Sequence, residues 1–373
     1  MMQNEQIGDA TAQNEKLVLP KIFADHMVLQ RHKPIPVWGK AGDSEEVSVE
    51  FMGRRKTVKA VSGRWRMELD PAPAGGPHGM TISCEDSEIA IRDIMIGEVW
   101  IAGGQSNMGY SFREIYGEET AWMVDAFNDD DFEGALSGIR LFKVEEYAAD
   151  EPADDVRDGQ WREVSRERML PLAAVPVFFA CALKRRLNVP VGIVQVSRSG
   201  TKASCWIPRS AACSAPAISM YREEFVEEEE RLGRDDLRRP FGLYNGMVSP
   251  IQPYAMCGVI WYQGESDALE QKGRRYGTLF PALLQAWRSG WGGEAFPFLY
   301  VELPDYVDGL DEWELVRTAQ NRTLELVSNT GMIATRDLGE ADNLHPRNKR
   351  PVGERLAALA MKQVYGVEAA GKE

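Results

Sequence analysis

Apolar runs of strand length alternate with helical patterns from about residue 94 onward, and this alternation restricts the fold more than any other feature. Such alternation is typical of a mostly parallel, doubly wound sheet with helices on its faces. We predict an α/β fold. The predicted strands are Val99–Ala102, Ile139–Phe142, Val191–Val196, Gly258–Tyr262, Phe298–Val301 and Met332–Thr335. The predicted helices are Val177–Leu187, Tyr276–Trp287, Glu314–Val327 and Val352–Val364.

The chain divides into three parts by pattern. Residues 1–16 are polar and have no apolar core of a secretory signal, so we expect a loose tail and a cytoplasmic protein. Residues 17–93 contain short runs with period-2 alternation, separated by Gly and Pro turns such as Gly75-Gly76-Pro77. This pattern predicts a small antiparallel β-sandwich. Residues 94–373 then form the α/β domain.

Charge limits the partners of the chain. Its 373 residues carry 43 Lys and Arg against 57 Asp and Glu, a net charge of −14. Nucleic acids and anionic membranes require a basic face, so neither is an expected partner. No apolar stretch reaches the roughly 18–20 residues that span a bilayer. The highly charged segment 222–239 is read as a solvated surface helix, with a lid or partner-binding segment as the alternative.

Cysteine and histidine usage limits the chemistry. Five cysteines without a C-x-x-C pair indicate free thiols in a reducing compartment. The four histidines form no H-E-x-x-H motif and no cluster with cysteine, so we expect no metal and no cofactor. Self-association into a homo-oligomer is left open by the sequence.

A candidate nucleophile follows the first predicted strand of the α/β domain. Ser106 comes directly after Gly103-Gly104-Gln105, and glycines permit the sharp turn that lifts a hydroxyl to the carboxyl edge of a sheet. Far downstream, Asp342 and His345 lie three residues apart. A neutral imidazole can remove the serine proton, and a carboxylate can orient the imidazole. An alternative role for Asp342 is to cap the helix that starts near Arg350.

Acyl transfer also requires donors for the oxyanion of its tetrahedral intermediate. The backbone N–H of Ser106 is one candidate. Gly200 follows a second predicted strand and offers a closely approaching N–H, and Gln263 follows a third and offers a side-chain amide. Taken singly, Gly200 and Gln263 would be ordinary turn residues, but together they indicate one site at the carboxyl edge of the sheet.

These segments closely resemble the sialate O-acetylesterase family of the SGNH hydrolases. The resemblance rests on Gly-Gln-Ser-Asn-Met at 104–108, Trp-Tyr-Gln-Gly-Glu-Ser at 261–266 and the Asp-x-x-His pair, and it extends over about residues 17–365. It implies a β-sandwich ahead of a flavodoxin-like α/β hydrolase domain that removes acetyl groups from sugar hydroxyls. It also implies that Ser106 is the nucleophile, His345 the base and Asp342 its orienting acid. Ser106, Gly200 and Gln263 would form the oxyanion hole.

Four further side chains are candidates for contact with an acetylated sugar: Gln105, Asn107, Arg198 and Glu265. For Glu265 a structural role is favoured. Many members of the family have Trp-Gly-Gly-Thr where this chain has Arg-Ser-Gly-Thr at 198–201, so Arg198 could meet an anionic sugar or alter the acyl pocket.

Two other functions compete with a sialate O-acetylesterase. One is an esterase for acetylated xylan or xylo-oligosaccharides, and the other is a catalytically silent carbohydrate-binding protein. The complete set of Ser106, Asp342 and His345 argues against the silent binder. An α/β-hydrolase fold is disfavoured because its G-x-S-x-G elbow requires glycine where Met108 stands.

Overall fold

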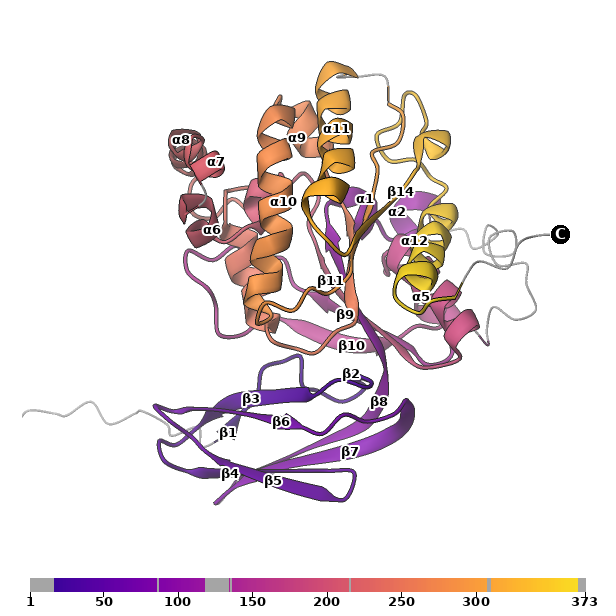
Figure 1. The fold of residues 1–373 in the computed structure, drawn as a ribbon. Helices are drawn as coiled ribbons and strands as arrows, with labels where there is room; N and C mark the ends of the chain where they lie inside the picture. Colours follow the sequence, from indigo (N-terminus) through magenta and orange to yellow (C-terminus); the bar gives the residue numbers. More distant parts are fainter. Residues whose placement is uncertain are drawn as a thin grey trace, which may run out of the picture.

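The computed structural model describes residues 17–85, 87–117, 134, 136–214, 216–306 and 310–367. A mixed sheet of 11 strands and a separate sheet of three strands account for the β structure of these residues. Figure 1 shows an all-β part that contains β1 to β7 and a larger part in which helices surround the sheet. The mixed α/β class predicted from the sequence is confirmed.

The larger part is built on seven strands in the order β10-β9-β11-β8-β12-β13-β14. From β9 to β14 along this order every neighbouring pair is parallel, and β10 pairs with β9 antiparallel at one edge. The strands are β8 (Ser87–Gly104), β9 (Ile139–Val144), β10 (Gly159–Glu163), β11 (Val191–Ser197), β12 (Gly258–Tyr262), β13 (Phe298–Val301) and β14 (Thr330–Ile333).

Helices pack against one another in two groups beside this sheet. Helix α5 contacts α12, whereas α10 contacts α11 and lies near α9 (Figure 1). The longer helices are α5 (Ala174–Leu187), α8 (Arg222–Leu232), α10 (Gly273–Gly290), α11 (Leu310–Leu326) and α12 (Arg350–Gln363). The shorter ones are α1 (Ser106–Gly109), α2 (Phe112–Tyr116), α6 (Arg209–Ser214), α7 (Pro216–Ser219) and α9 (Glu265–Leu269). Single turns of 3₁₀ or π helix lie at Arg166–Arg168, Ala203–Trp206, Tyr244–Val248, Ser249–Ile251 and Arg336–Leu338.

The all-β part shares strand β8 with the larger part. The first half of β8 pairs with β7 and β2, and β7 continues through β4 to β5. The three-stranded sheet has the order β1-β3-β6. The predicted boundary at residues 93 and 94 therefore falls inside one continuous strand. The remaining strands are β1 (Leu17–Val18), β2 (Val28–Gln30), β3 (Ile35–Ala41), β4 (Glu46–Phe51), β5 (Arg54–Lys59), β6 (Arg64–Leu69) and β7 (Gly75–Cys84).

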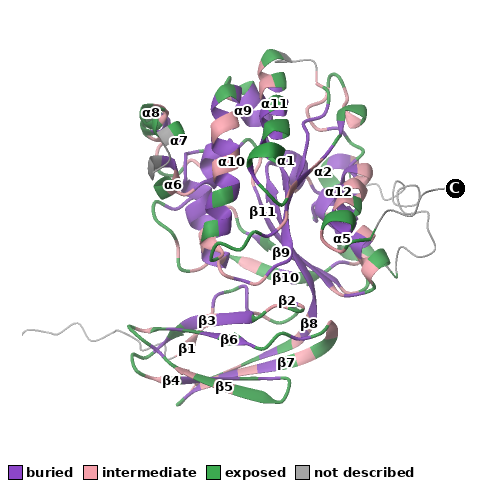
Figure 2. Cartoon of the chain, viewed as in Figure 1, coloured by how far each residue is buried: buried purple, intermediate pink, exposed green. Residues whose placement is uncertain are grey.

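The central parallel strands are the most deeply buried part of the sheet. Every residue of β11, β12 and β13 is buried, as expected for strands covered on both faces. Figure 2 shows β11 in the buried colour and α8 largely in the exposed colour. Helix α8 thus confirms the surface-helix interpretation of the charged segment up to Leu232, and a loop follows from Gly233.

Two local predictions were wrong. Gly75-Gly76-Pro77 is not a turn but the start of β7, where the pairing with β8 shifts register. Proline and glycine are tolerated in strands at such irregular positions. Strand β14 begins and ends two residues before the predicted range, because it pairs Thr330 to Ile333 with Phe298 to Val301 of β13.

The structure also bears on two expectations drawn from composition, one about the cysteines and one about membrane-spanning segments. The four cysteines whose side chains are described form no disulfide, as predicted, and all four are buried. The side chain of Cys213 lies outside the described residues. Within the described residues, no helix combines the length and the apolar character that crossing a membrane requires.

Candidate active site

A tight turn at the end of β8 presents Ser106. Gly104 has φ of +134°, and a Cβ there would lie 2.1 Å from the carbonyl oxygen of Tyr262, so only glycine fits. The next residue, Gln105, donates its backbone N–H to the same carbonyl at 2.9 Å. The turn is therefore fixed against β12, and Ser106 is the first residue of α1.

The structure brings His345 to this serine. The distance between His345 Nε2 and Ser106 Oγ is 2.9 Å, a hydrogen bond between residues 239 positions apart in the chain. The Tyr110 ring stacks on the imidazole, with centroids 4.3 Å apart and planes at 29°. Desolvation lowers the pKa of His345, the charge of Lys349 lowers it further, and Glu114 opposes both. The imidazole is therefore biased toward the neutral form that can accept a proton.

Asp342 is not bonded to the imidazole. Its side chain is exposed, and among the described residues no hydrogen bond joins it to His345. The alternative prediction, that Asp342 caps the helix starting near Arg350, is wrong, because the residue at the N-cap of α12 is Lys349. The histidine loop is held instead by Asn343, whose Oδ1 accepts the backbone N–H of His345 at 3.0 Å.

Gly200 lies in an ordered loop after β11. Its φ is +71°, a conformation that favours glycine, and the residue is exposed. Thr201 Oγ1 donates to the Arg198 carbonyl at 2.7 Å, and the backbone N–H of Arg198 donates to the Gly104 carbonyl at 3.1 Å. The loop is thereby attached to the turn that carries Ser106.

Gln263 is fully buried beneath that loop. Its amide nitrogen has three acceptors, namely Asp267 Oδ2 at 2.6 Å, the Thr201 carbonyl at 3.1 Å and Gln105 Oε1 at 3.3 Å. Two N–H groups are therefore already used by the protein. Burial raises the pKa of Asp267 to about 6. In this arrangement Gln263 ties the Gly200 loop to α9, and an oxyanion would compete for its protons.

Three of the four candidates for sugar contact are internal. Gln105, Asn107 and Glu265 are each at most 2% exposed. Gln105 accepts backbone N–H groups of the β12–α9 turn, and Asn107 Nδ2 donates to Glu265 Oε1 at 2.5 Å. Their placement does not support sugar contact, because they link buried turns. The fourth, Arg198, is partly exposed and forms an ion pair with Glu146 at 2.9 Å, so it is not a free cation.

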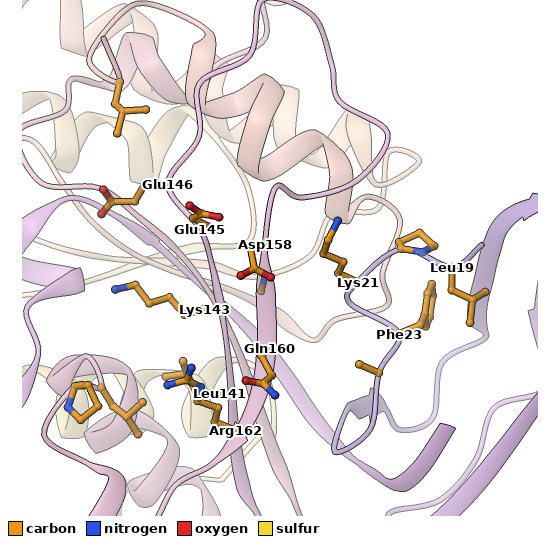
Figure 3. A pocket seen from close by; sticks show the side chains of 16 residues that line it. Leu19, Lys21, Phe23, Leu141, Lys143, Glu145, Glu146, Asp158, Gln160 and Arg162 are labelled. Atoms are coloured by element: carbon orange, nitrogen blue, oxygen red, sulfur yellow. The ribbon is translucent and has the colours of Figure 1, made fainter. Parts of the chain in front are cut away.

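A cleft of about 950 Å³ lies along the β9 and β10 edge of the sheet. Figure 3 shows side chains of both strands and of the 19–24 segment around it. The antiparallel register of β9 and β10 places four side chains on the same face of the sheet: Leu141, Lys143, Gln160 and Arg162. Within the described residues Lys143 and Arg162 have no ion-pair partner. Two residues connect the walls of the cleft to the loops around Ser106. Glu146 forms an ion pair with Arg198, and the Leu172 carbonyl accepts the Phe112 N–H.

Sequence reasoning missed two residues beside the imidazole. Tyr110 follows the serine turn by four residues, and an aromatic at that spacing carries no specific signal. Lys349 is 1% exposed and donates from Nζ to Asn107 Oδ1. The sequence could have indicated Lys349, because a lysine at the N-terminus of a predicted helix is unfavourable for the helix dipole and so suggests another role.

One group of described residues has the composition of a metal site. His26, Asp93 and Glu163 have ligand atoms within 4.8 Å of one another. The Arg140 guanidinium already donates to Asp93 at 2.8 Å and lies 3.6 Å from Glu163. This cation supplies the charge that the carboxylates require. Asp93 lies in the first half of β8, away from the Ser106 end of that strand, and Glu163 lies in the edge strand β10. The group therefore gives no reason to place a metal in the site.

Comparison with known proteins defines the class. The structure superimposes on that of a carbohydrate acetylesterase from Xanthomonas citri with a TM-score of 0.81 and 33% sequence identity. The match covers 94% of this chain and 76% of the other. The protein is therefore a carboxylic ester hydrolase of the carbohydrate esterase class.

The family follows from the sequence. Residues 96–362 match the model of the carbohydrate esterase, sialic acid-specific acetylesterase family, and the chain belongs to that family. The sialate O-acetylesterase of Rattus norvegicus is 28% identical over 92% of this chain and 72% of its own length. The Homo sapiens enzyme is 27% identical over 91% of this chain and 69% of its own. The resemblance stated from the motifs is confirmed.

Proposed function

We propose that the protein is a serine esterase that removes O-acetyl groups from carbohydrates through an acetyl-enzyme intermediate, on an SGNH-type α/β domain preceded by a β-sandwich. The observation that carries the proposal is the 2.9 Å contact between His345 Nε2 and Ser106 Oγ. A serine becomes nucleophilic when a neutral imidazole within hydrogen-bond distance accepts its proton. The lowered pKa of His345 supports this role near neutral pH.

The reaction then runs in two halves. Ser106 Oγ attacks the acetyl carbonyl while its proton passes to His345 Nε2. The sugar hydroxyl leaves with that proton, and the acetyl group stays on Ser106. Water, whose proton passes to His345, then attacks the acetyl-serine. The bond between Ser106 Oγ and the acetyl carbon breaks, His345 returns the proton to Oγ, and the acetyl group leaves as acetic acid, which ionises to acetate.

Two backbone N–H groups are the proposed oxyanion donors. Ser106 begins α1, where the first N–H groups of a helix have no acceptor within the helix. Gly200 lies in the loop attached to the serine turn. Gln263 completes the predicted hole, and in the free enzyme its contact with the Thr201 carbonyl supports this loop. We propose that Asp342 accepts the imidazole N–H in the substrate complex, because catalytic hydrogen bonds often form only there.

Hydrolysis of a chromogenic acetyl ester by three variants tests the mechanism. Ser106→Ala, His345→Ala and the double variant are expected to lose nearly all turnover to the same extent, because the two residues act as one unit. Mass spectrometry of a wild-type reaction stopped early should show one acetyl group on Ser106. Retained turnover in Ser106→Ala would remove the serine mechanism, whereas a wild-type protein without turnover would leave the carbohydrate-binding alternative.

The cleft favours an acidic sugar over the neutral xylo-oligosaccharide alternative. In the part of the chain that the structure describes, Lys143 and Arg162 have no ion-pair partner, and they lie on one face of the β9–β10 edge. Two cations so placed suit a sugar carboxylate, although Glu145, Glu146 and Asp158 also line the cleft. A double Lys143→Met and Arg162→Met variant is expected to raise KM for an acetylated sialoside. KM for an acetylated xylo-oligosaccharide should stay the same. Equal effects on both substrates would favour the xylo-oligosaccharide esterase.

A further inference from the structure

The Asn107 amide joins three turns of the active site. Its Nδ2 donates to Glu265 Oε1 at 2.5 Å and to the Leu344 carbonyl at 3.1 Å, and its Oδ1 accepts from Lys349 Nζ. The amide orientation is fixed by its partners, because a flipped amide would face its oxygen toward two acceptors and its nitrogen toward an ammonium. Asn107 follows Ser106, and Leu344 precedes His345. One side chain therefore connects the neighbours of the nucleophile and the base.

Two buried charges lie on opposite sides of this amide. Glu265 is 0% exposed and Lys349 is 1% exposed, and Asn107 stands between them. Burial raises the pKa of Glu265 and lowers that of Lys349 to about 8. The ammonium also lies 5.8 Å from the centre of the Tyr262 ring. Buried charges of this kind contribute little net stability and are often destabilising, so stability alone does not account for them.

Lys349 also acts on the imidazole by charge. Of the charged groups around His345, Lys349 opposes its protonation and Glu114 favours it, while the Tyr110 ring covers one face. Glu340, which accepts the Arg347 N–H in the same loop, and Glu265 both act on Lys349 itself. Because Lys349 stands at the N-cap of α12 without a capping bond, the helix gains nothing from its charge.

We propose that Lys349 is a positioning residue of the esterase: through Asn107 and Glu265 it holds the histidine loop on the serine turn. We call Lys349, Asn107 and Glu265 the amide brace. The proposal rests on the proposed function, because it requires His345 to act as the base. Displacement of a catalytic group by about 1 Å can reduce the rate by about 10²-fold, which gives a brace between the two groups a kinetic role.

The test compares Lys349→Met with the double variant Lys349→Met/Glu265→Gln. The single variant leaves Glu265 buried without its cation, so its Tm should fall. The double variant removes both charges and should recover the Tm. In both variants we expect kcat for the chromogenic acetyl ester to fall at least tenfold with KM within about twofold. The acid limb of kcat/KM should also move to higher pH, since the neighbouring cation is gone.

Lys33→Met is the matched control. Like Lys349, Lys33 is a lysine whose ammonium forms side-chain hydrogen bonds, here to the Glu294 carboxylate and the Met256 carbonyl, but it lies outside the site. Its kcat, KM and acid limb should equal those of the wild type. Recovery of kcat and of the wild-type acid limb together with Tm in the double variant would show a purely structural brace and overturn the proposal. Unchanged kcat in Lys349→Met would overturn it equally. Failure of the serine mechanism would show separately, as turnover retained in Ser106→Ala.

Discussion

At the residue scale, the site depends on which partners surround the imidazole. Nε2 faces Ser106, the ring lies on Tyr110, and the backbone N–H is held by Asn343. Two carboxylates compete for the supporting role. Asp342 shares the loop with His345, whereas Glu114 acts on the imidazole by charge and accepts the Ser111 hydroxyl at 2.7 Å.

Exchange of each carboxylate for its amide separates these roles. Asp342→Asn should lower kcat by about 10²-fold or more, because it weakens imidazole orientation in the substrate complex. Glu114→Gln keeps a capping side chain for α2 and should change kcat by less than about threefold. Steady-state kinetics on one acetyl ester measures both. Full activity in Asp342→Asn with loss in Glu114→Gln would transfer the supporting role to Glu114.

The pH dependence of kcat/KM follows from the environment of His345. Desolvation and Lys349 lower its pKa, so the neutral base persists to a lower pH than for an ordinary histidine. The free-enzyme value governs kcat/KM. We expect the acid limb to have its midpoint below about pH 6.5, the ordinary histidine value. A midpoint above that value would mean that a nearby carboxylate dominates the imidazole.

At the element scale, the site is formed where parallel strands end. The turns after β8, β11 and β12 converge, and the loop after β14 supplies His345. The sequence predicted these strands and Ser106 because they depend on local patterns of apolar runs and glycine turns, and it predicted His345 from the Asp342-x-x-His345 spacing. It did not predict the burial of Gln263 or the partner of Asn107. Asn107 and Glu265 are separated by 158 positions, and only the assembled sheet brings them together.

These turns also restrict the acyl group. The residues after Ser106, Asn107 and Met108, are buried and packed, so little space remains beneath the serine for a long chain. Each methylene that a pocket accepts or rejects changes the barrier by about 1–3 kcal/mol. Acetyl esters should be cleaved faster than butyryl esters, and octanoyl esters hardly at all. The comparison of kcat/KM across these chain lengths on one leaving group decides it, and a maximum at octanoyl would indicate a lipase-like pocket.

At the scale of the whole molecule, the all-β part and the α/β part share strand β8 and buried hydrogen bonds. Trp161 of β10 donates from Nε1 to the Ile22 carbonyl at 2.8 Å, and the Tyr254 hydroxyl donates to the Val28 carbonyl at 2.8 Å. Gln30 accepts the Val99 N–H at 2.8 Å beside the continuous strand. Strands shared in this way couple the two parts more strongly than a linker does.

We therefore expect the full chain to unfold in one transition. Calorimetry, far-UV circular dichroism and hydrolysis of a chromogenic acetyl ester should lose their signals at the same temperature on heating. Tyr254→Phe leaves the buried Val28 carbonyl without its donor, at a cost of about 1–3 kcal/mol, and should lower that single Tm by a few degrees. A separate transition of β structure at lower temperature, with esterase activity intact above it, would show that the all-β part is an independent unit and that β8 does not transmit stability between them.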